Sequence, residues 1–490
     1  MKLLELLEGV EIVNIKDVER ISEIEIEGIS SNSKNIEKDY MFIALEGGRF
    51  DGHSFIEEAI RNGAVVAVGE KEIEGDLPYI RVKNSKEAYS YISSNFYKNP
   101  FRYIRTIGVT GTNGKTTTVN LIGKILEANG EKIGIIGTLG ARLGEEILPT
   151  QFTTPEQLLL AELYNRAKLM GINRIVMEVS SHALVQHRVD AVRFEGAIFT
   201  NLTQDHLDFH KDMESYYLAK RRLFEMVSNR QDCIMVINTD DPYGKRLIKE
   251  FGAYHPITYG IKEPATVTAK NIKTSPEGLL FELVIENQRF IVKSKLLGEV
   301  NVYNILSAIG YTYSLGVPLS NAIDVILNFS PVRGRLERID LGQPFQVLID
   351  YAHTPDALER VLKVAKSLGK RLIVVFGCGG DRDKTKRPIM GNIATRVSDL
   401  AIITSDNPRS EEPIKIIEDI ISGIERDNYI IKEDRKEAIN YAIDLAEPGD
   451  VIVIAGKGHE TYQIFKDVII HFDDREVAIE AIRRRINSEQ

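Results

Sequence analysis

The sequence predicts an α/β protein of three domains, and three observations lead to this fold class. The chain has 490 residues, which exceeds what one hydrophobic core accommodates. Short apolar runs of strand length alternate with amphipathic helical patterns, as in parallel sheets covered by helices. A glycine-rich segment, GTNGKTTT at residues 111–118, lies between an apolar run and an amphipathic run. Such a turn is typical of a P-loop mononucleotide-binding domain.

We expect a small α/β N-terminal domain over residues 1–100, a central P-loop mononucleotide-binding domain with a parallel sheet over 101–330, and a C-terminal Rossmann-like doubly wound domain over 331–490. The first boundary falls at Asn99 and Pro100. The second falls in residues 328–334, which contain Pro331 and Gly334.

Each domain shows its own apolar runs. In the N-terminal domain strands are expected at 40–45 and 64–68, with a helix at 54–62. The central domain has buried-type strands at 104–109, 133–136, 174–177, 197–199 and 233–237, a strand-rich stretch at 267–292, and helices at 304–315 and 320–329. The C-terminal domain has strands at 345–350, 371–376, 400–404 and 451–455.

Composition excludes several classes of protein. A formal charge of −9 without a dense basic stripe argues against a nucleic-acid surface. The two cysteines, Cys233 and Cys378, are far apart, so neither a disulfide framework nor a thiolate zinc site is indicated. No apolar run is long enough to span a membrane, and the first residues do not form a signal peptide. We therefore expect a cytoplasmic protein without membrane insertion. A monomer is a separate expectation, which composition does not decide.

The GTNGKTTT segment predicts a nucleoside triphosphate site. Its glycines and the following helix start present backbone N–H groups to an anion. Lys115 is placed to reach the terminal phosphates and Thr116 to hold Mg²⁺. The first glycine of the usual P-loop pattern would fall at Val109, whereas Gly108 stands one place earlier.

Two polar residues follow buried strands of the central domain, at the sheet edge where open α/β sheets bind ligands. Glu178 comes directly after one strand, and His206 follows another. A carboxylate suits Mg²⁺, and an imidazole is a less usual partner. Taken alone, each is equally well interpreted as a capping residue at a strand end. Their shared position with Lys115 favours a metal site.

Lys220 occupies an unusual place in the predicted helix 213–227. It lies in the apolar stripe formed by Tyr216, Leu223, Phe224 and Val227. Lysine is seldom buried without a partner, so its amine either extends to water or points into the active site. A neutral, desolvated amine can add CO₂ and become an anionic oxygen ligand. The pattern by itself favours extension to water.

Three loops rich in glycine and charge follow strands of the C-terminal domain: GCGGDRDKTKRP at 377–388, TSDNPRSEEP at 404–413 and AGKGHETY at 455–462. Arg382, Arg409 and Asp406 could clamp a small zwitterion, with guanidinium groups on carboxylates and Asp406 on an ammonium. Each loop alone is also compatible with a solvated connection.

With these motifs in place, the chain resembles the Mur ligase family of bacterial cell-wall synthesis, and within it the ligases for meso-diaminopimelate. The ordered matches span essentially the whole chain and include SNSK, TGTNGKTTT, TTPE, MEVSSHALVQHRV, NLTQDHLDFH, YYLAKRRLF, DYAHTP, DNPR and GKGHE. The missing first glycine of the P-loop is the form usual in this family.

The resemblance implies a role for each matching residue. ATP binding falls to Gly111, Thr112, Asn113, Gly114, Lys115, Thr116, Thr117, Asn301, Asn304, Arg335, Asp350 and His353. The UDP-linked substrate would lie along Ser33, Thr153, Thr154, Ser180, Gln186 and Arg188. The amino-acid pocket matches Arg382, Asp406, Asn407, Pro408, Arg409, Gly456 and Glu460. Metal ligands would be Thr116, Glu178, His206 and Lys220, with Lys115, Lys220 and His206 catalytic. Lys220 matches the family's N-carboxylated lysine, which reverses the preference for extension to water.

The reaction that the resemblance implies is ADP-forming amide ligation, in which ATP activates the D-glutamate carboxylate of UDP-N-acetylmuramoyl-L-alanyl-D-glutamate and meso-diaminopimelate attacks the acyl phosphate. Mg²⁺ and a CO₂-derived carbamate on Lys220 are the implied cofactors, and three domains imply closure on substrates. Alternatives are the same reaction with meso-lanthionine or L-lysine, a ligase resembling folylpolyglutamate synthetase, and a binding protein that uses ATP as a switch.

Overall fold

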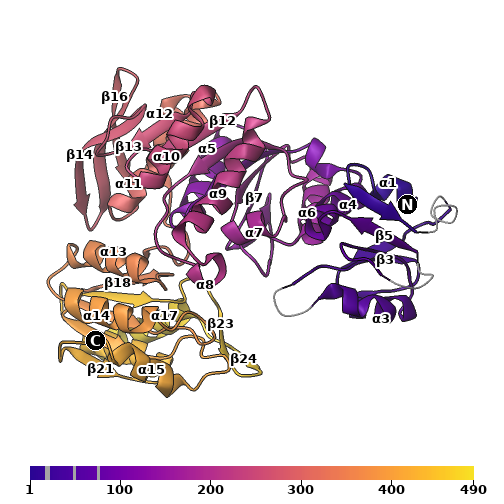
Figure 1. Cartoon of the computed structure of the whole chain (residues 1–490). Helices are drawn as coiled ribbons and strands as arrows, with labels where there is room; N and C mark the ends of the chain where they lie inside the picture. Colours follow the sequence, from indigo (N-terminus) through magenta and orange to yellow (C-terminus); the bar gives the residue numbers. More distant parts are fainter. Residues whose placement is uncertain (17–22, 48–50, 74–77, 490) are drawn as a thin grey trace.

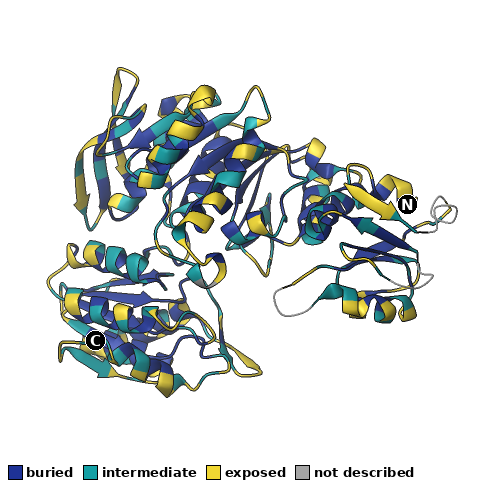
Figure 2. Ribbon diagram, in the orientation of Figure 1, coloured by how far each residue is buried: buried dark blue, intermediate teal, exposed yellow. Residues whose placement is uncertain are grey.

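The described residues fold around three principal sheets that lie in sequence order, each with its own helices (Figure 1). The computed structural model describes all residues except 17–22, 48–50, 74–77 and 490. Buried strands lie inside each body, and the exposed residues lie on the outer faces of the helices, in loops and on some strands at sheet edges (Figure 2). The predicted three-domain α/β fold is confirmed. No described helix combines the length and apolar character needed to cross a membrane.

The N-terminal sheet has five strands in the order β1-β5-β4-β3-β2, with β1 antiparallel to β5 and the other pairs parallel. Asn84 begins the long helix of this domain, because its side chain accepts hydrogen bonds from the backbone N–H groups of Lys86 and Glu87. The elements are α1 (Leu3–Leu6), β1 (Ile12–Ile15), β2 (Gly28–Ser30), β3 (Tyr40–Ile43), α3 (Ile56–Arg61), β4 (Ala64–Gly69), β5 (Tyr79–Val82) and α4 (Ser85–Phe96).

The central sheet has eleven strands in the order β16-β15-β14-β13-β12-β11-β6-β10-β7-β8-β9. The strands are β6 (Arg105–Thr110), β7 (Ile133–Gly137), β8 (Gly140–Leu143), β9 (Glu146–Leu148), β10 (Arg174–Glu178), β11 (Phe194–Phe199), β12 (Ile234–Asn238), β13 (Ile257–Gly260), β14 (Val267–Ser275), β15 (Gly278–Ile285) and β16 (Gln288–Ser294). Neighbours from β14 to β7 are parallel, whereas both ends continue as antiparallel strands. The predicted parallel sheet is therefore only the middle of a mixed sheet.

Helices cover both faces of the central sheet and form two apolar cores. One core joins the sheet to α5 (Lys115–Ala128), α11 (Glu299–Ser314) and α12 (Leu319–Asn328). The other joins it to α6 (Gln157–Leu169), α7 (Ser181–Val185), α9 (Met213–Ser228) and α10 (Pro242–Glu250). A short helix, α8 (Leu207–His210), precedes α9. The two cores hold the carboxyl ends of β6, β10 and β11 rigidly side by side.

The C-terminal sheet has the order β17-β18-β22-β19-β20-β21, and all pairs except β17 with β18 are parallel. Its strands are β17 (Glu337–Ile339), β18 (Gln346–Asp350), β19 (Leu372–Phe376), β20 (Leu400–Ile403), β21 (Tyr429–Ile431) and β22 (Val451–Ala455). One face packs on α13 (Pro355–Lys366), α14 (Lys386–Val397) and α15 (Pro413–Ile421), and the other on α16 (Arg435–Leu445) and α17 (Asp474–Glu489). A hairpin of β23 (Tyr462–Phe465) and β24 (Val468–His471) projects beside the sheet (Figure 1).

Candidate active site

The glycine-rich loop joins β6 to α5, as predicted, and residues after β11 brace it. The hydroxyl of Thr200 donates to the carbonyl oxygen of Asn113 at 2.7 Å, and Asn201 Oδ1 accepts from the Asn113 N–H at 3.0 Å. Gly114 has φ +88°, and a Cβ there would lie 2.4 Å from Asn304 Oδ1. Only glycine fits this position, which lets α11 approach the start of α5.

Lys115 is the first residue of α5 and folds back over the loop. Its ammonium donates to the carbonyl oxygens of Gly111 at 2.9 Å and Thr112 at 2.8 Å. Burial lowers the pKa of Lys115, an effect that Glu178 and Asp205 oppose and Arg335 reinforces. The loop thus gathers positive charge at a helix N-terminus, the arrangement that binds phosphate.

Glu178 ends β10 and contacts the next residue of the loop. Its Oε2 accepts from the hydroxyls of Thr116 and Thr138, each at 3.1 Å, and its Oε1 accepts from the Thr138 N–H at 2.8 Å. The side chain is buried. A buried carboxylate next to a hydroxyl is the hard-oxygen donor set that Mg²⁺ prefers, so these residues fit the predicted metal. Thr138 carries no recognisable motif, and sequence reasoning missed it.

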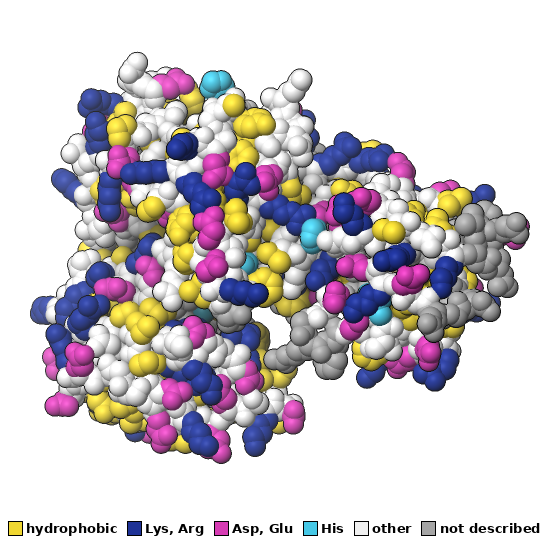
Figure 3. Space-filling view, viewed as in Figure 1, with side chains coloured by type: hydrophobic (Ala, Val, Ile, Leu, Met, Phe, Trp, Pro, Cys, Tyr) yellow, Lys and Arg dark blue, Asp and Glu magenta, His cyan; other side chains and the backbone are white. Residues whose placement is uncertain are grey.

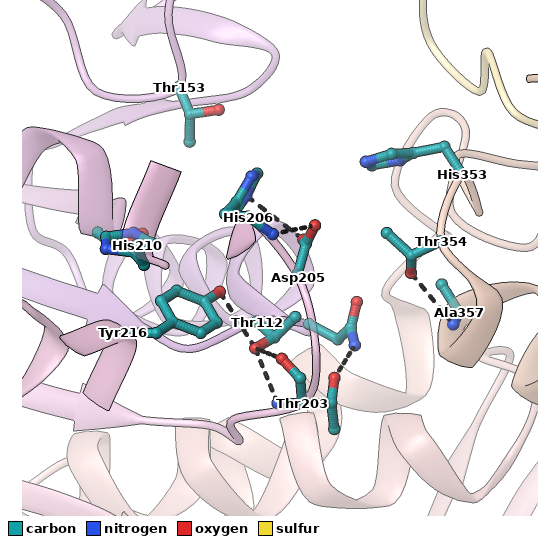
Figure 4. A network of polar contacts seen from close by, with 12 residues as sticks. Thr112, Thr153, Thr203, Asp205, His206, His210, Tyr216, His353, Thr354 and Ala357 are labelled. Carbon is teal, nitrogen blue, oxygen red and sulfur yellow. Dashed lines mark hydrogen bonds and ion pairs between the residues drawn. The ribbon is translucent and has the colours of Figure 1, made fainter. Parts of the chain in front are cut away.

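His206 lies on the other side of the loop, beside Asp205 (Figure 4). Nε2 of His206 lies 3.3 Å from Oδ2 of Asp205. Burial lowers the pKa of His206 to about 3, and the neighbouring His182, Lys220 and Lys115 act in the same direction. The negative charge of Asp205 opposes this lowering of the His206 pKa. A neutral imidazole is the form that ligates a metal. The sequence did not single out Asp205, although it is the residue before His206.

Lys220 lies on α9 with its amine buried under the loop. The side chain is fully buried, and Nζ donates to the Gly111 carbonyl oxygen at 2.8 Å. The ring of Tyr216 lies 4.6 Å away. Burial lowers the pKa of Lys220 well below its usual value, and the charge of Lys115 lowers it further. The expectation from the helical pattern alone, that this amine extends to water, is wrong, because the apolar stripe of α9 packs into the core of the central sheet and places Lys220 beneath the loop.

Residues of the C-terminal domain reach the same loop. Arg335 Nη2 donates to the hydroxyl of Thr116 at 3.1 Å, and Asp356 Oδ2 accepts from Asn113 Nδ2 at 3.2 Å and from the Thr203 hydroxyl at 3.1 Å. His353 lies beyond Asp205 in the same network (Figure 4). Asp356 is a further residue that the sequence analysis did not name.

Asp350, at the end of β18, fixes the backbone next to Arg335. Its carboxylate accepts from the backbone N–H groups of Leu336 at 2.7 Å and Ala352 at 2.8 Å, and burial raises its pKa to about 6. Asn301 and Asn304, on α11, bond to each other at 2.9 Å beside the loop. The predicted nucleotide residues of both domains are therefore brought together.

Most residues predicted for the UDP-linked substrate cluster beside Glu178. Thr154 donates to the Glu178 carbonyl oxygen at 2.8 Å and accepts from the Ser180 N–H at 3.0 Å. Arg188 donates to the Thr154 carbonyl oxygen at 2.8 Å and to Gln186 Oε1 at 2.6 Å, while Thr153 contacts the hydroxyl of Thr138 at 3.2 Å.

Ser33 stands apart in the N-terminal domain, where its hydroxyl donates to Glu58 Oε2 at 2.7 Å. An open gap lies between the N-terminal and C-terminal domains on the face in Figure 3.

The predicted amino-acid pocket is built from loops after β19, β20 and β22. Arg409 has φ +53°, and its Nη1 donates to the Gly380 carbonyl oxygen at 2.8 Å. A Cβ on Gly379 would lie 2.9 Å from Arg409 Nη1 and 3.8 Å from Arg382 Cγ, so both arginines flank this glycine. Arg382 is exposed and donates only to the adjacent Asp381 carbonyl oxygen, at 3.1 Å, among the hydrogen bonds of the described residues.

Asp406 is buried against Gly456, where φ is +112° and a Cβ would lie 2.6 Å from Asp406 Oδ2. Asn407 Nδ2 donates to Glu460 Oε2 at 2.8 Å. Pro408, the residue between the buried asparagine and Arg409, is also buried. Buried Lys457 contacts both members of the Asn407–Glu460 pair, and the sequence analysis passed over it although it lies inside GKGHE.

Comparison with known proteins shows which family the chain belongs to. The Mur ligase family catalytic domain matches residues 25–97, the Mur ligase middle domain 109–312 and the Mur ligase glutamate ligase domain 334–458. The UDP-N-acetylmuramoyl-L-alanyl-D-glutamate--2,6-diaminopimelate ligase of Listeria innocua serovar 6a is 43% identical over 492 residues, covering 99% of both chains.

Solved structures agree with this relationship. A structure of a UDP-N-acetylmuramoyl-L-alanyl-D-glutamate--2,6-diaminopimelate ligase has a TM-score of 0.70 at 32% identity and covers 99% of each chain. Mycobacterium tuberculosis folylpolyglutamate synthase, complexed with ADP and AMPPCP, has a TM-score of 0.64 at 17% identity over 75% of this chain and 92% of its own, a likeness of fold alone. Over its full length, the chain belongs to the Mur ligase family.

Proposed function

We propose that this chain is an ATP-dependent, ADP-forming ligase that adds meso-diaminopimelate to UDP-N-acetylmuramoyl-L-alanyl-D-glutamate in peptidoglycan precursor synthesis. The observation that carries the proposal is the contact between the C-terminal domain and the phosphate-binding loop, through Arg335 on Thr116 and Asp356 on Asn113. It brings the domain with the amino-acid pocket to the place where ATP would be split.

The reaction follows from this arrangement. A carboxylate oxygen of the D-glutamate end attacks the γ-phosphorus of ATP, and ADP leaves. The amine of diaminopimelate then attacks the acyl carbon, phosphate leaves with the C–O bond electrons, and the amine gives up a proton. Lys115, at the start of α5, offsets negative charge on the transferred phosphoryl group. Closure of the domains excludes water, which would otherwise hydrolyse the acyl phosphate.

Thr116, Glu178 and His206 are the residues that would hold Mg²⁺, which supplies positive charge against the phosphates when bound. Lys220 is proposed to carry a carbamate: its neutral amine nitrogen adds to the carbon of CO₂ and loses a proton, giving anionic oxygens. The burial of its amine and its lowered pKa support this proposal, because the neutral form is the one that reacts.

Substrate roles are proposed residue by residue. Ser33 would bind the uridine end, and the Thr154 cluster would bind the rest of that substrate. Arg382, Arg409, Asp406, Asn407, Pro408, Gly456 and Glu460 would bind the amino acid. The domain limits 1–100, 101–330 and 331–490 are proposed on the same footing, since each range encloses one principal sheet. Monomeric state and cytoplasmic location stay predictions.

The decisive experiment measures phosphate release by the purified protein with ATP, the muramyl dipeptide nucleotide and each of meso-diaminopimelate, meso-lanthionine, L-lysine and L-glutamate. We expect release only when both the nucleotide substrate and an amino acid are present, with meso-diaminopimelate or meso-lanthionine preferred. A parallel assay replaces the muramyl dipeptide nucleotide with a folate, and phosphate release there with L-glutamate would favour a ligase resembling folylpolyglutamate synthetase. Nucleotide binding without any release would favour the ATP-switch alternative.

A further inference from the structure

Lys457 is a buried cation that the proposed chemistry does not use. It follows β22, and its side chain is fully enclosed. Nζ donates to Asn407 Oδ1 at 3.2 Å and to Glu460 Oε2 at 3.1 Å. Lysine is almost never buried without a purpose that compensates its desolvation, so this ammonium calls for an explanation.

Lys457 locks two pocket residues into one geometry. Asn407 Oδ1 accepts from Lys457 and also from the Ile464 N–H at 3.1 Å, which leaves the Asn407 amide to donate to Glu460. Both side-chain bonds to Glu460 end on Oε2. These two bonds fix the orientation of the Glu460 carboxylate. Its other oxygen, Oε1, accepts neither of them.

The charged groups of the pocket converge on Tyr462. Burial raises the pKa of this phenol, Glu460 and Asp406 add to the rise, and Arg409 and Arg382 oppose it. Lys457 Nζ lies 5.4 Å from the centroid of the same ring. All five charged side chains thus act within one small region.

Asp406 is the carboxylate of this region that lacks a donor. It is 7% exposed, and none of the hydrogen bonds among the described residues ends on its carboxylate oxygens. Glu460, in contrast, is paired with Lys457. Asp406 is therefore the group left to meet a ligand ammonium, and the two arginines are left to meet a ligand carboxylate.

We propose that Lys457 is a positioning residue that sets the selectivity of the amino-acid pocket: by neutralising Glu460 it keeps the pocket matched to a distal end with both an ammonium and a carboxylate, rather than to an ammonium alone. The proposal rests on the proposed function. Around Tyr462 the three cations Arg382, Arg409 and Lys457 act together with the two carboxylates Asp406 and Glu460. Loss of Lys457 leaves two of each, which removes the excess positive charge that favours a substrate carboxylate.

The test compares meso-diaminopimelate with L-lysine, which lacks the distal carboxylate, in wild type, Lys457→Met and Lys457→Gln. Glutamine keeps an N–H donor but no charge, so it separates charge from hydrogen bonding and carries the test if the methionine variant does not fold. Lys415→Met is the matched control, because Lys415 is an exposed lysine of the same domain paired only with Glu412 among the salt bridges of the described residues.

We expect the ratio of kcat/KM for diaminopimelate to kcat/KM for lysine to fall about tenfold or more in both Lys457 variants, the size expected for one charge-assisted contact. KM for diaminopimelate should rise, while KM for ATP and for the muramyl nucleotide stay within about twofold, unlike the general loss that unfolding would cause.

An unchanged ratio in Lys457→Gln would overturn the proposal, because hydrogen bonding alone would then suffice. Equal increases in all three KM values would also overturn it and indicate a structural role. If wild type releases no phosphate with either amino acid, the proposed function itself fails and this inference with it. An active wild type with variants of unaltered selectivity sinks the inference alone.

Discussion

Lys115 and Lys220 donate to the same carbonyl oxygen, that of Gly111, at 2.9 and 2.8 Å. Two ammonium groups on one acceptor repel each other, and burial adds to the effect on both. The repulsion between the two ammonium groups is relieved when one amine becomes neutral or is converted to an anionic group. Lys115 lies at the phosphate-binding helix start, so Lys220 is the amine expected to change.

Lys115→Ala should abolish ligation and leave the fold intact. The change removes a positive charge at the transferred phosphoryl group and little buried apolar area. Steady-state phosphate release and thermal unfolding measure the two effects. Loss of one such electrostatic contact should leave roughly a few per cent of the activity at most. A higher activity of the variant would contradict the assigned role of Lys115.

Lys220→Arg should inactivate the enzyme, because a guanidinium stays charged and cannot add CO₂. Lys220→Ala should regain part of its activity with a small added carboxylate that supplies the missing oxygens. Mass spectrometry at neutral pH and activity assays with and without bicarbonate check the modification. Full activity of Lys220→Arg would rule out the proposal that Lys220 carries a carbamate.

Asp356→Ala should loosen the C-terminal domain from the phosphate-binding loop, because two hydrogen bonds across the domains are lost. Each is worth about 1 kcal/mol, so KM for ATP should rise roughly threefold to thirtyfold. Small-angle scattering should show a larger radius of gyration. Glu359→Ala on the same helix, whose partners Lys363 and Arg396 both belong to the C-terminal domain, is the control and should change neither quantity.

Asp350 should make the C-terminal domain less stable as the pH rises from 5 to 7. Its native pKa of about 6 exceeds the value of 3.8 in an unfolded chain, so between these values the native state binds more protons and loses stability with rising pH. Over this range the free energy of unfolding of the wild type should fall by about 1 kcal/mol relative to that of Asp350→Asn. Hydrogen exchange of the β18 and β22 amides, without nucleotide, measures this stability. A difference between the two proteins that does not change with pH would refute the raised pKa of Asp350.

Arg409→Ala should lower kcat/KM for meso-diaminopimelate by at least about thirtyfold and leave the poor use of L-lysine similar, since loss of a desolvated charge pair costs about 2–5 kcal/mol. The structure supplies the competing explanation, because Arg409 also donates to Gly380. An equal loss for both amino acids would assign Arg409 to support of the loop.

The sequence predicted the buried parallel strands and the long helices because their apolar periodicity is strong. Helix 213–227, for example, is observed as α9, Met213–Ser228. The hairpins at β8–β9 and β23–β24 were not predicted, since short edge strands with exposed residues have little periodicity. The strand-rich stretch at 267–292 was expected, and it is observed as β14, β15 and β16.

In the site, motifs located Lys115, Thr116 and Glu178, because loop chemistry and strand ends are local in sequence. The environment of Lys220 could not be read from its own helix, since the acceptor Gly111 is 109 residues away. Thr138, Asp356 and Lys457 were missed for a related reason: each acts through partners on other elements.

The loops that would contact the amino acid follow β22, β19 and β20, which are neighbours in the C-terminal sheet, while the phosphate-binding loop belongs to another sheet. The turns that would select the building block thus belong to one sheet, and the loop that would bind the phosphates of ATP belongs to another, to which the C-terminal domain adds Arg335. A lineage with this architecture can exchange the residue it incorporates by altering a few adjacent turns, and the energy-coupling machinery is inherited intact.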